Sequence, residues 1–475
     1  MAPFNSFILL LSSYTFFLFV VVATKDLSLD TKQEETHHYH TLHQSSFLPS
    51  SVCNSSTTGD KKKGTLEVVH KHGPCSKFSE DNVKPLTIEE IFTRDQARVD
   101  FIRAKSTFTK AKKDTLGKKT TLPANSGYTF GIGNYYITVG LGTPKRDLSL
   151  VFDTGSDLTW TQCQPCVGSC YSQIEPIFAP SKSTTYTNIS CTSSECSALI
   201  TATGNPPSCI SSTCVYGILY GDQSFSSGFF AKEKLTITSK DVVENFYFGC
   251  GQNNQGLFFG VAGLLGLGKG SKLSIVSQTA AKYGKVFSYC LPTPTATGYL
   301  TFGSAASSKV KYTPIVNLKQ PTFYGLNLIA IFVGGTKLAI SPTVFKTSGM
   351  IIDSGTTITR LPPAAYSALS KAFRAKMTKY PLTKALSLLD TCYDLSNYTT
   401  ILIPTISMLW GGNTKVDTPA QGILFVNSVS QVCLAYAANK HDSDLGIYGN
   451  TQQKTMEIVY DVKAGKIGFA PGGCA

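Results

Sequence analysis

The chain has 475 residues, 42% of them hydrophobic, which is enough to build more than one domain around a large core. Its 40 Gly and 22 Pro favour short strands joined by tight turns. The net charge is +13, and six of the seven histidines precede residue 73. Only His441 is left in the remainder, which argues against a histidine-based catalytic triad or a Cys/His metal site there.

The first residues predict a secretory signal peptide. An uncharged apolar run covers residues 7–22, is short for a membrane span and ends in small residues before Thr24, although no Lys or Arg precedes it. A chloroplast transit peptide would be richer in Ser and Arg and less apolar. We expect residues 1–23 to be removed, no membrane span to remain, and the protein to be exported to the apoplast or vacuole rather than the chloroplast.

Residues 24–125 differ in composition from the remainder of the chain and predict a prosegment. They contain Ser-, Thr- and His-rich stretches and one long helix, which begins near Thr87 with Glu90 as its capping-box partner. The apolar face of this helix is formed by Ile88, Ile91, Phe92, Val99 and Ile102. A basic tail, KAKKDTLGKK, occupies residues 110–119.

From residue 126 the sequence is typical of a mainly β protein, and it divides near residue 310 into the halves 126–310 and 311–475. Twelve of the fourteen cysteines lie here, an even number that suits six disulfides in an oxidising compartment. The close spacing of Cys163, Cys166 and Cys170 also occurs in zinc sites, but disulfides are the commoner use of such clusters in an exported chain. We expect neither a metal nor another cofactor.

Each half contains one copy of the same motif directly after an apolar triplet. The first copy is Asp-Thr-Gly-Ser at residues 153–156, and the second is Asp-Ser-Gly-Thr at residues 353–356. A single copy could be an Asx turn that caps its own loop, but two in equivalent places are hard to attribute to chance. Two neighbouring carboxyls share one proton, so one can activate water while the other protonates a carbonyl. The pair predicts catalytic residues Asp153 and Asp353, whose outer oxygens the hydroxyls of Ser156 and Thr356 can hydrogen-bond.

These motifs resemble those of the pepsin-like aspartic proteases, over about residues 130–475. The resemblance implies a mainly β, bilobal fold, with two β-barrel-like lobes that each contribute one aspartate to a cleft. It also implies a flap with Tyr220 and Gly221, and a hydrogen bond from Trp160 to Tyr220. The segments at residues 264–266 and 447–449 match two apolar-apolar-Gly segments packed behind the catalytic loops.

The cysteine-rich insertion at residues 163–214 is similar to that of the plant nepenthesin-like branch. This resemblance implies the disulfides Cys163–Cys166, Cys170–Cys250, Cys191–Cys214, Cys196–Cys209, Cys290–Cys474 and Cys392–Cys433, although spacing alone leaves the connectivity open. Sequons at Asn54, Asn188 and Asn397 predict a glycoprotein. The basic body of the chain and Asp222 beside the flap leave the working pH open.

The predicted function is that of a secreted, monomeric aspartic endopeptidase, which hydrolyses polypeptides between hydrophobic residues with an activated water. The family resemblance implies a zymogen in which a prosegment lysine pairs with the two aspartates, and the lysines of residues 110–119 are the candidates. On this view the prosegment is an intramolecular inhibitor.

Two alternatives stay open. The first is a weak or inactive relative that binds or inhibits other enzymes. The second is a basic protease associated with nucleic acid, which the charge permits, but no nucleic-acid motif is present and much of the densest lysine clustering lies in the predicted prosegment. Adhesion to acidic cell-wall polysaccharide accounts for the charge equally well.

Overall fold

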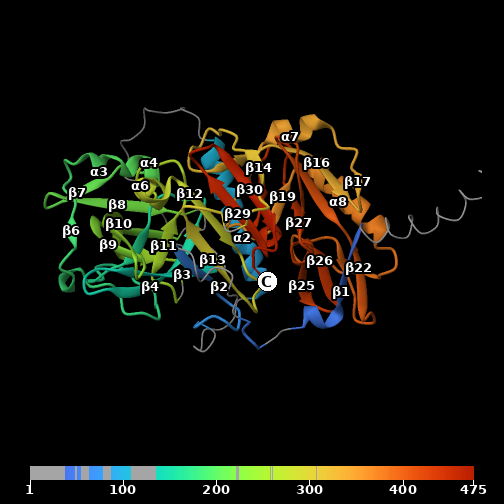
Figure 1. Ribbon diagram of the computed structural model, residues 1–475, viewed down its shortest axis with the longest axis horizontal. Coiled ribbons are helices and arrows are strands. Elements are labelled where there is room, and N and C mark those ends of the chain that lie inside the picture. The colour runs from blue at the N-terminus through green and yellow to red at the C-terminus, as the bar shows by residue number, and fades with distance from the viewer. Residues whose placement is uncertain are drawn as a thin grey trace, which may run out of the picture.

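The computed structural model describes residues 38–48, 51–54, 64–78, 87–107, 135–220, 224–256, 258, 260–305 and 307–474. Within these ranges the protein is mainly β and has two lobes, green to yellow and orange to red in Figure 1, with helix α2 (Ile88–Thr107) between them. The predicted mainly β, bilobal fold is confirmed. The predicted signal peptide, the lysines of residues 110–119, Gly221 and Asp222 lie outside the described residues.

The largest sheet has fifteen strands and contains strands from both halves of the chain. Its order is β14-β30-β29-β12-β13-β2-β3-β4-β11-β5-β10-β9-β8-β7, with β6 paired to β9. These strands are β2 (Thr65–His70), β3 (Tyr135–Leu141), β4 (Arg146–Asp153), β5 (Trp160–Gln162), β6 (Thr187–Asn188), β7 (Ser208–Ile210), β8 (Thr213–Leu219), β9 (Phe225–Thr238), β10 (Asp241–Gln255), β11 (Gly263–Gly266), β12 (Val286–Cys290), β13 (Thr297–Phe302), β14 (Lys311–Pro314), β29 (Met456–Asp461) and β30 (Lys466–Pro471).

The second lobe is built from smaller sheets, ordered β15-β18-β28-β19-β27, β17-β16-β23-β24 and β20-β21-β26-β25. Their strands are β15 (Tyr324–Leu326), β16 (Leu328–Val333), β17 (Thr336–Lys337), β18 (Met350–Ile352), β19 (Thr359–Leu361), β20 (Leu382–Thr383), β21 (Cys392–Tyr393), β23 (Ile406–Trp410), β24 (Thr414–Asp417), β25 (Leu424–Ser428), β26 (Gln431–Leu434), β27 (Tyr436–Ala438) and β28 (Gly446–Tyr448). The remaining α-helices are α3 (Ser194–Ser197), α4 (Leu199–Thr203), α5 (Ile275–Gln278), α6 (Ala280–Tyr283), α7 (Pro342–Ser348), α8 (Pro363–Lys376) and α9 (Ala420–Ile423).

The two lobes repeat one strand arrangement. In the first, β3-β4-β11-β5-β10 are neighbours in this order, with antiparallel, parallel, antiparallel and parallel pairings. In the second, β15-β18-β28-β19-β27 have the same sequence of pairings. Of the segments predicted to lie behind the catalytic loops, residues 264–266 belong to β11 and residues 447–448 to β28, and each of these strands pairs in parallel with a strand that leads into an aspartate motif. This repetition gives the two motifs equivalent positions.

The segment before residue 126 is integrated into both lobes. Strand β2 lies inside the largest sheet, between β13 and β3, with Leu66 and Val68 buried. Strand β1 (Tyr39–His43) pairs with β22 (Thr400–Pro404) of the second lobe, blue beside orange in Figure 1. The predicted prosegment therefore supplies backbone hydrogen bonds to the sheets as well as a helix.

Helix α2 begins as the sequence predicts. The hydroxyl of Thr87 accepts from the backbone N–H of Glu90 at 3.2 Å, and the Glu90 carboxylate accepts from the backbone N–H of Thr87 at 2.7 Å. Phe92, Val99 and Ile102 are at most 1% exposed. Burial of each such side chain contributes about 1.5–3 kcal/mol, so apolar packing holds much of the helix in place. None of the helices in the described ranges combines the length and apolar character needed to cross a membrane.

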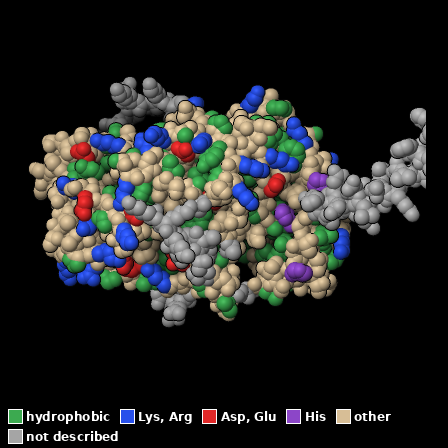
Figure 2. Space-filling view, viewed as in Figure 1, with side chains coloured by type: hydrophobic (Ala, Val, Ile, Leu, Met, Phe, Trp, Pro, Cys, Tyr) green, Lys and Arg blue, Asp and Glu red, His purple; other side chains and the backbone are tan. Residues whose placement is uncertain are grey.

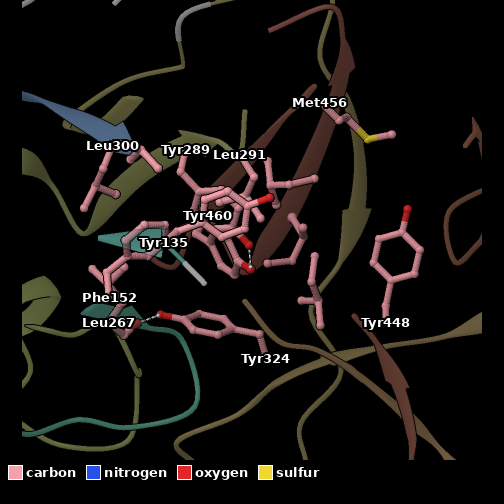
Figure 3. Packing of buried hydrophobic residues seen from close by; sticks show 14 of the residues in the cluster. Tyr135, Phe152, Leu267, Tyr289, Leu291, Leu300, Tyr324, Tyr448, Met456 and Tyr460 are labelled. Atoms are coloured by element: carbon pink, nitrogen blue, oxygen red, sulfur yellow. Dashed lines mark hydrogen bonds between the residues drawn. The ribbon is translucent and has the colours of Figure 1, made fainter. Parts of the chain in front are cut away.

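The core extends across both halves of the chain. Figure 3 shows Tyr135, Phe152 and Leu267 of the first half close to Tyr324 and Tyr460 of the second. The Tyr324 hydroxyl donates to the carbonyl of Leu267 at 2.7 Å, so its buried polar end has a partner. The two lobes therefore share one continuous apolar core.

All fourteen cysteines are paired, and four of the six implied pairs are wrong. The implied Cys290–Cys474 and Cys392–Cys433 bonds are present. In place of the other four, the structure contains Cys163–Cys250, Cys166–Cys170, Cys191–Cys209 and Cys196–Cys214. Cys53–Cys75, which was not predicted from the sequence, adds a seventh in the N-terminal segment.

Strand neighbours explain the difference. Cys163 directly follows β5, which runs parallel to the part of β10 that contains Cys250, and both side chains are buried. Cys196 and Cys214 belong to one buried cluster, so they bond to each other. The more exposed cysteines of the insertion, Cys191 with Cys209 and Cys166 with Cys170, pair among themselves.

Peptide mapping without reduction should recover these pairs. The protein is digested under conditions that prevent thiol exchange, and the disulfide-linked peptides are identified by mass spectrometry. We expect a peptide containing Cys163 to be linked to one containing Cys250, with Cys166 and Cys170 closing a small loop. A linkage of Cys163 to Cys166 would contradict this arrangement of β5 and β10.

Candidate active site

Two aspartates come together at the centre of the strand repeat. Asp153 is the last residue of β4, and Asp353 directly follows β18. The apolar triplets before them, at residues 150–152 and 350–352, are buried, which explains why the part of each strand that leads into its aspartate is apolar. Asp153 is 1% exposed and Asp353 is 0% exposed, so each strand delivers its carboxylate into the interior.

The two motif loops hold each other in place. The Thr154 hydroxyl accepts from the backbone N–H of Ser354 at 2.9 Å. In return, the Ser354 hydroxyl accepts from the backbone N–H of Thr154 at 3.2 Å. Because the contacts are reciprocal and buried, the spacing of the two carboxylates is fixed by both lobes.

Hydroxyl groups orient the carboxylates. Ser156 donates to Asp153 Oδ2 at 2.7 Å, and Thr356 donates to Asp353 Oδ2 at 2.6 Å. The backbone N–H of Gly155 donates to Asp153 Oδ1 at 2.9 Å. A Cβ at Gly155 would lie 3.0 Å from Asp353 Oδ1, so glycine allows the second carboxylate to approach closely. The Oδ1 atoms consequently face each other across the site.

Arg98 of α2 occupies the space between the carboxylates. Its Nη2 lies 2.5 Å from Asp153 Oδ1 and 2.8 Å from Asp353 Oδ1, and its Nε donates to Asp353 Oδ2 at 2.8 Å. Burial opposes the charge of Arg98, but the two carboxylates outweigh it and raise the pKa of the guanidinium. Burial likewise opposes ionisation of Asp353, but Arg98 outweighs it and lowers the pKa of that carboxyl. The group is therefore a compact ion cluster.

The cation at the aspartates is thus an arginine within the predicted helix. The lysines of residues 110–119, which were expected in this place from the family resemblance, lie outside the described residues. A signal for Arg98 was present in the sequence. Ile91, Asp95, Arg98 and Ile102 lie on one face of the helix, with an isoleucine at each end. Charged residues at the inner positions of an otherwise apolar row predict buried partners.

A second ion pair fixes the same helix. Asp95 Oδ2 lies 2.8 Å from Nη2 of Arg360, and both side chains are 1% exposed. The Asp95 carboxylate also accepts from the backbone N–H groups of Thr357 and Ile358, directly after the second motif. Neither Asp95 nor Arg360 was identified from the sequence, because they are 265 positions apart and only the fold brings them together.

The first lobe closes over α2 through Tyr220. Nε1 of Trp160 donates to the Tyr220 hydroxyl at 2.8 Å, and both rings pack against Phe258. Between α2 and this lobe remains a cavity of about 20 Å³, lined by Arg98, Ile102, Asp153, Ser156 and Tyr220 among others. This volume holds roughly one water molecule, so α2 fills the site.

Asp157, four residues after Asp153, is a buried acid that sequence reasoning did not identify. It accepts hydrogen bonds from the Thr322 hydroxyl at 2.8 Å and from the backbone N–H groups of Gly270 and Ser271 at 2.9 and 3.3 Å. Burial nevertheless raises its pKa to about 6. The acid joins the first motif loop to the beginning of the second half of the chain.

Comparisons with known proteins agree with this geometry. Two family models match, described as xylanase inhibitor N-terminal over residues 135–304 and xylanase inhibitor C-terminal over residues 323–471. An aspartyl protease family protein of Arabidopsis thaliana is 56% identical over 452 residues, 94% of this chain and 95% of the relative. Aspartic proteinase nepenthesin-2 of Nepenthes gracilis is 38% identical over 359 residues, 72% of this chain and 78% of the relative.

Solved structures share the fold at low sequence identity. The crystal structure of edgp has a TM-score of 0.58 at 19% identity, covering 71% of this chain and 91% of that one. Conglutin gamma, a basic 7S globulin from lupine seeds, has a TM-score of 0.56 at 21% identity, with the same coverage. The chain belongs to the pepsin-like plant aspartic protease family, which includes the nepenthesins, and is an aspartic-type endopeptidase.

The pH dependence of stability should report Asp157. Its pKa is about 6 in the folded protein against an ordinary value of 3.8, so its contribution is fully present below 3.8 and is lost as pH rises through about 6. Asp157→Asn keeps an oxygen acceptor for the two N–H groups. In the parent protein, Asp157 should lower the free energy of unfolding by about 2–3 kcal/mol between pH 4 and 7, and in the variant this decrease should be absent.

Denaturant unfolding at both pH values measures this loss, with Asp353→Asn present in every protein to prevent self-digestion. Asp442→Asn, at an exposed position, is the matched control and should leave the pH dependence unchanged. An equal loss of stability in the Asp157→Asn protein and its parent would contradict the assignment.

Proposed function

We propose that the protein is an exported aspartic endopeptidase that uses Asp153 and Asp353 as its catalytic dyad and is made as a zymogen. The observation that carries this proposal is the shared contact of both Oδ1 atoms with one guanidinium, at the centre of two equivalent strand arrangements. Two carboxylates this close require a cation, or else a shared proton, between them.

Without Arg98, the same two oxygens can hold a water molecule and one proton. The ionised carboxylate takes a proton from the water, whose oxygen attacks the scissile carbonyl carbon, while the protonated carboxyl donates its proton to the carbonyl oxygen. The carboxyl that took the proton from water then donates it to the amide nitrogen as the C–N bond breaks. The other, now ionised, accepts a proton from the diol. The hydroxyls of Ser156 and Thr356 hold the outer oxygens, so that the inner ones face the water.

The zymogen part of the proposal rests on helix α2. The guanidinium of Arg98 takes the place that the water needs, and the cavity of about 20 Å³ that remains beside it has no room for a polypeptide. Removal of the segment before residue 126 would open the site. Because β2 lies between β13 and β3 in the largest sheet, its departure would also leave the edges of these two strands to be covered again.

Export to the apoplast or vacuole is supported by seven disulfides. The sequon residues Asn54, Asn188 and Asn397 are exposed, as glycosylation requires. On the face that Figure 2 shows, Lys and Arg side chains are scattered over both lobes among Asp and Glu, a distribution that suits weak adhesion to an acidic polysaccharide. We propose that the enzyme acts as a monomer on polypeptides.

A non-catalytic binding role is the alternative, since the matching family models are described as xylanase inhibitor domains and a similar solved structure is a 7S globulin. Both aspartates with their orienting hydroxyls are complete in this chain. An unneeded pair of buried carboxylates would be costly to keep, which favours catalysis.

Asp153→Asn and Asp353→Asn should each lower kcat by at least about 10³-fold, because an amide can neither share the proton nor activate water. Each precursor is processed by a trace of wild-type enzyme, which is then removed, and peptide hydrolysis is measured. Asp442→Asn serves as the control and should retain full activity. Secretion of the precursors and the melting temperatures of the processed proteins, from which Arg98 has been removed, should stay close to wild type in all three variants. Substantial turnover by either dyad variant would sink the proposal.

Arg98→Gln should release the precursor from its dependence on acid. Asp353 has a lowered pKa because of Arg98, so the ion pair stabilises the closed precursor above the ordinary value of 3.8 and is lost as pH falls through the lowered value. The wild-type precursor should therefore stay inactive near neutral pH and open only on acidification. The variant should hydrolyse peptide, or bind pepstatin, without prior acidification.

The matched control is Arg103→Gln. It removes a cation from the same helix, but one that contacts Asn439 and Asp444 rather than the dyad. Its activation should retain the wild-type pH threshold. If Arg98→Gln requires the same acidification as wild type, another part of the segment controls opening.

A further inference from the structure

We propose that Arg360 and the backbone N–H groups of Thr357 and Ile358 form a subsite for an acidic side chain of the polypeptide substrate. The enzyme would then prefer Asp or Glu at one position close to the scissile bond. This inference rests on the proposed function and specifies the substrate class of the same cleft.

The subsite is already occupied by a carboxylate in the closed protein. Asp95 Oδ2 lies 2.8 Å from the Arg360 guanidinium and accepts a hydrogen bond from the backbone N–H of Ile358 at 3.2 Å. Its Oδ1 accepts from the backbone N–H of Thr357. Three donors converge on one buried carboxylate, which is the arrangement of a built anion site.

Arg360 occupies the position in the second lobe that Trp160 occupies in the first. It follows Asp353 by seven residues, as Trp160 follows Asp153, and it lies opposite Ile447 of β28 as Trp160 lies opposite Leu264 of β11. In the first lobe this position supports Tyr220 over the site. In the second lobe the equivalent position carries a guanidinium, so the two sides of the cleft differ in chemistry.

The spacing of Asp95 and Arg98 on α2 indicates which substrate residue would reach the subsite. Asp95 precedes Arg98 by three residues on α2, a rise of about 4.5 Å along the helix axis. An extended polypeptide advances about 3.3 Å per residue. A substrate side chain that replaces the Asp95 carboxylate would therefore belong to a residue within about three positions of the bond cleaved at the dyad.

Loss of α2 leaves Arg360 without its anion. Of the carboxylates in the described residues, only Asp95 lies within 4 Å of this guanidinium. Gln96, at 3.5 Å, belongs to the same helix, and the contact that remains is with the carbonyl of Ile358 at 3.1 Å. A guanidinium held by one carbonyl keeps most of its donors free and binds a carboxylate in a planar, paired geometry.

Arg360 could instead serve only to dock α2, in which case it would have no effect on the processed enzyme. The two roles are separated with processed enzyme and a series of peptides. A parent peptide with one cleavage site carries a hydrophobic residue on each side of the scissile bond and Gln at the next two positions outward on both sides, and Glu replaces one Gln at a time. The ratio of kcat/KM for Glu over Gln is measured above about pH 5, where a free Glu is ionised.

We expect one position at which wild type favours Glu by on the order of tenfold or more, the effect of a charge-assisted hydrogen bond. In Arg360→Gln the ratio should fall to about one, and in Arg360→Lys it should be partly kept. The control is Arg374→Gln. Arg374 is the other arginine after residue 310, and it lies on α8, where it pairs with Asp390. It should leave the ratio unchanged.

If Arg360→Gln fails to fold, the wild-type ratio of kcat/KM for Glu over Gln still tests whether an acidic subsite exists. Absence of a Glu preference at every position, or a preference that survives Arg360→Gln, overturns the subsite while peptide cleavage itself continues. A processed wild-type protein that cleaves none of the peptides contradicts the proposed function, and the inference with it.

Discussion

The central constraint on this structure is electrostatic. Two carboxylates lie in the interior, at most 1% exposed and within hydrogen-bonding distance of the same nitrogen atom. Two buried negative charges at this spacing are costly, and removal of one partner from such a cluster would leave the others unpaired. The side chain of Arg98 supplies one positive charge against these two negative charges, so the position of α2 and the ionisation of the dyad are linked. The strands that deliver the carboxylates, the loops that bind each other and the helix that supplies the cation each depend on this cluster.

The same constraint explains how the N-terminal segment is attached. One ion cluster would not hold a 20-residue helix in register, because an exposed or hydrated alternative is always available to an arginine. Apolar burial of Phe92, Val99 and Ile102 supplies most of the binding, and β1 and β2 add backbone hydrogen bonds to both lobes. The charged residues therefore determine where α2 sits, while the apolar residues and the strands determine how firmly it is held.

Much of the site could be predicted from the sequence, because its signals are local. An apolar triplet before Asp-Thr/Ser-Gly-Ser/Thr specifies a buried strand and a tight turn, and the hydroxyl three residues after each aspartate lies where the turn brings it back. The beginning of α2 was predictable for the same reason, since Thr87 and Glu90 are three residues apart.

Features that depend on distant partners could not be read in this way. The disulfide of Cys163 depends on β5 lying beside β10, and β2 lies between two strands from other parts of the chain. The partners of Arg98 and Arg360 could not be read from the sequence, because Arg98 meets acids 55 and 255 positions away and Arg360 meets one 265 positions away. Sequence periodicity marks such residues as inward-facing but does not identify what they face.

The two buried ion pairs of α2 have opposite polarity, and this has a consequence for the opened cleft. Arg98 brings a positive charge to the acidic dyad, and Asp95 brings a negative charge to the basic Arg360. Both pairs are made by the same helix, so both are lost together when α2 leaves. What it leaves is an acidic centre flanked by a guanidinium. A substrate that carries an acid at the matching position would restore one of the lost pairs, whereas the dyad, with its cation gone, must take up a proton. The loss of one helix would thus prepare the dyad for catalysis and uncover a determinant of specificity.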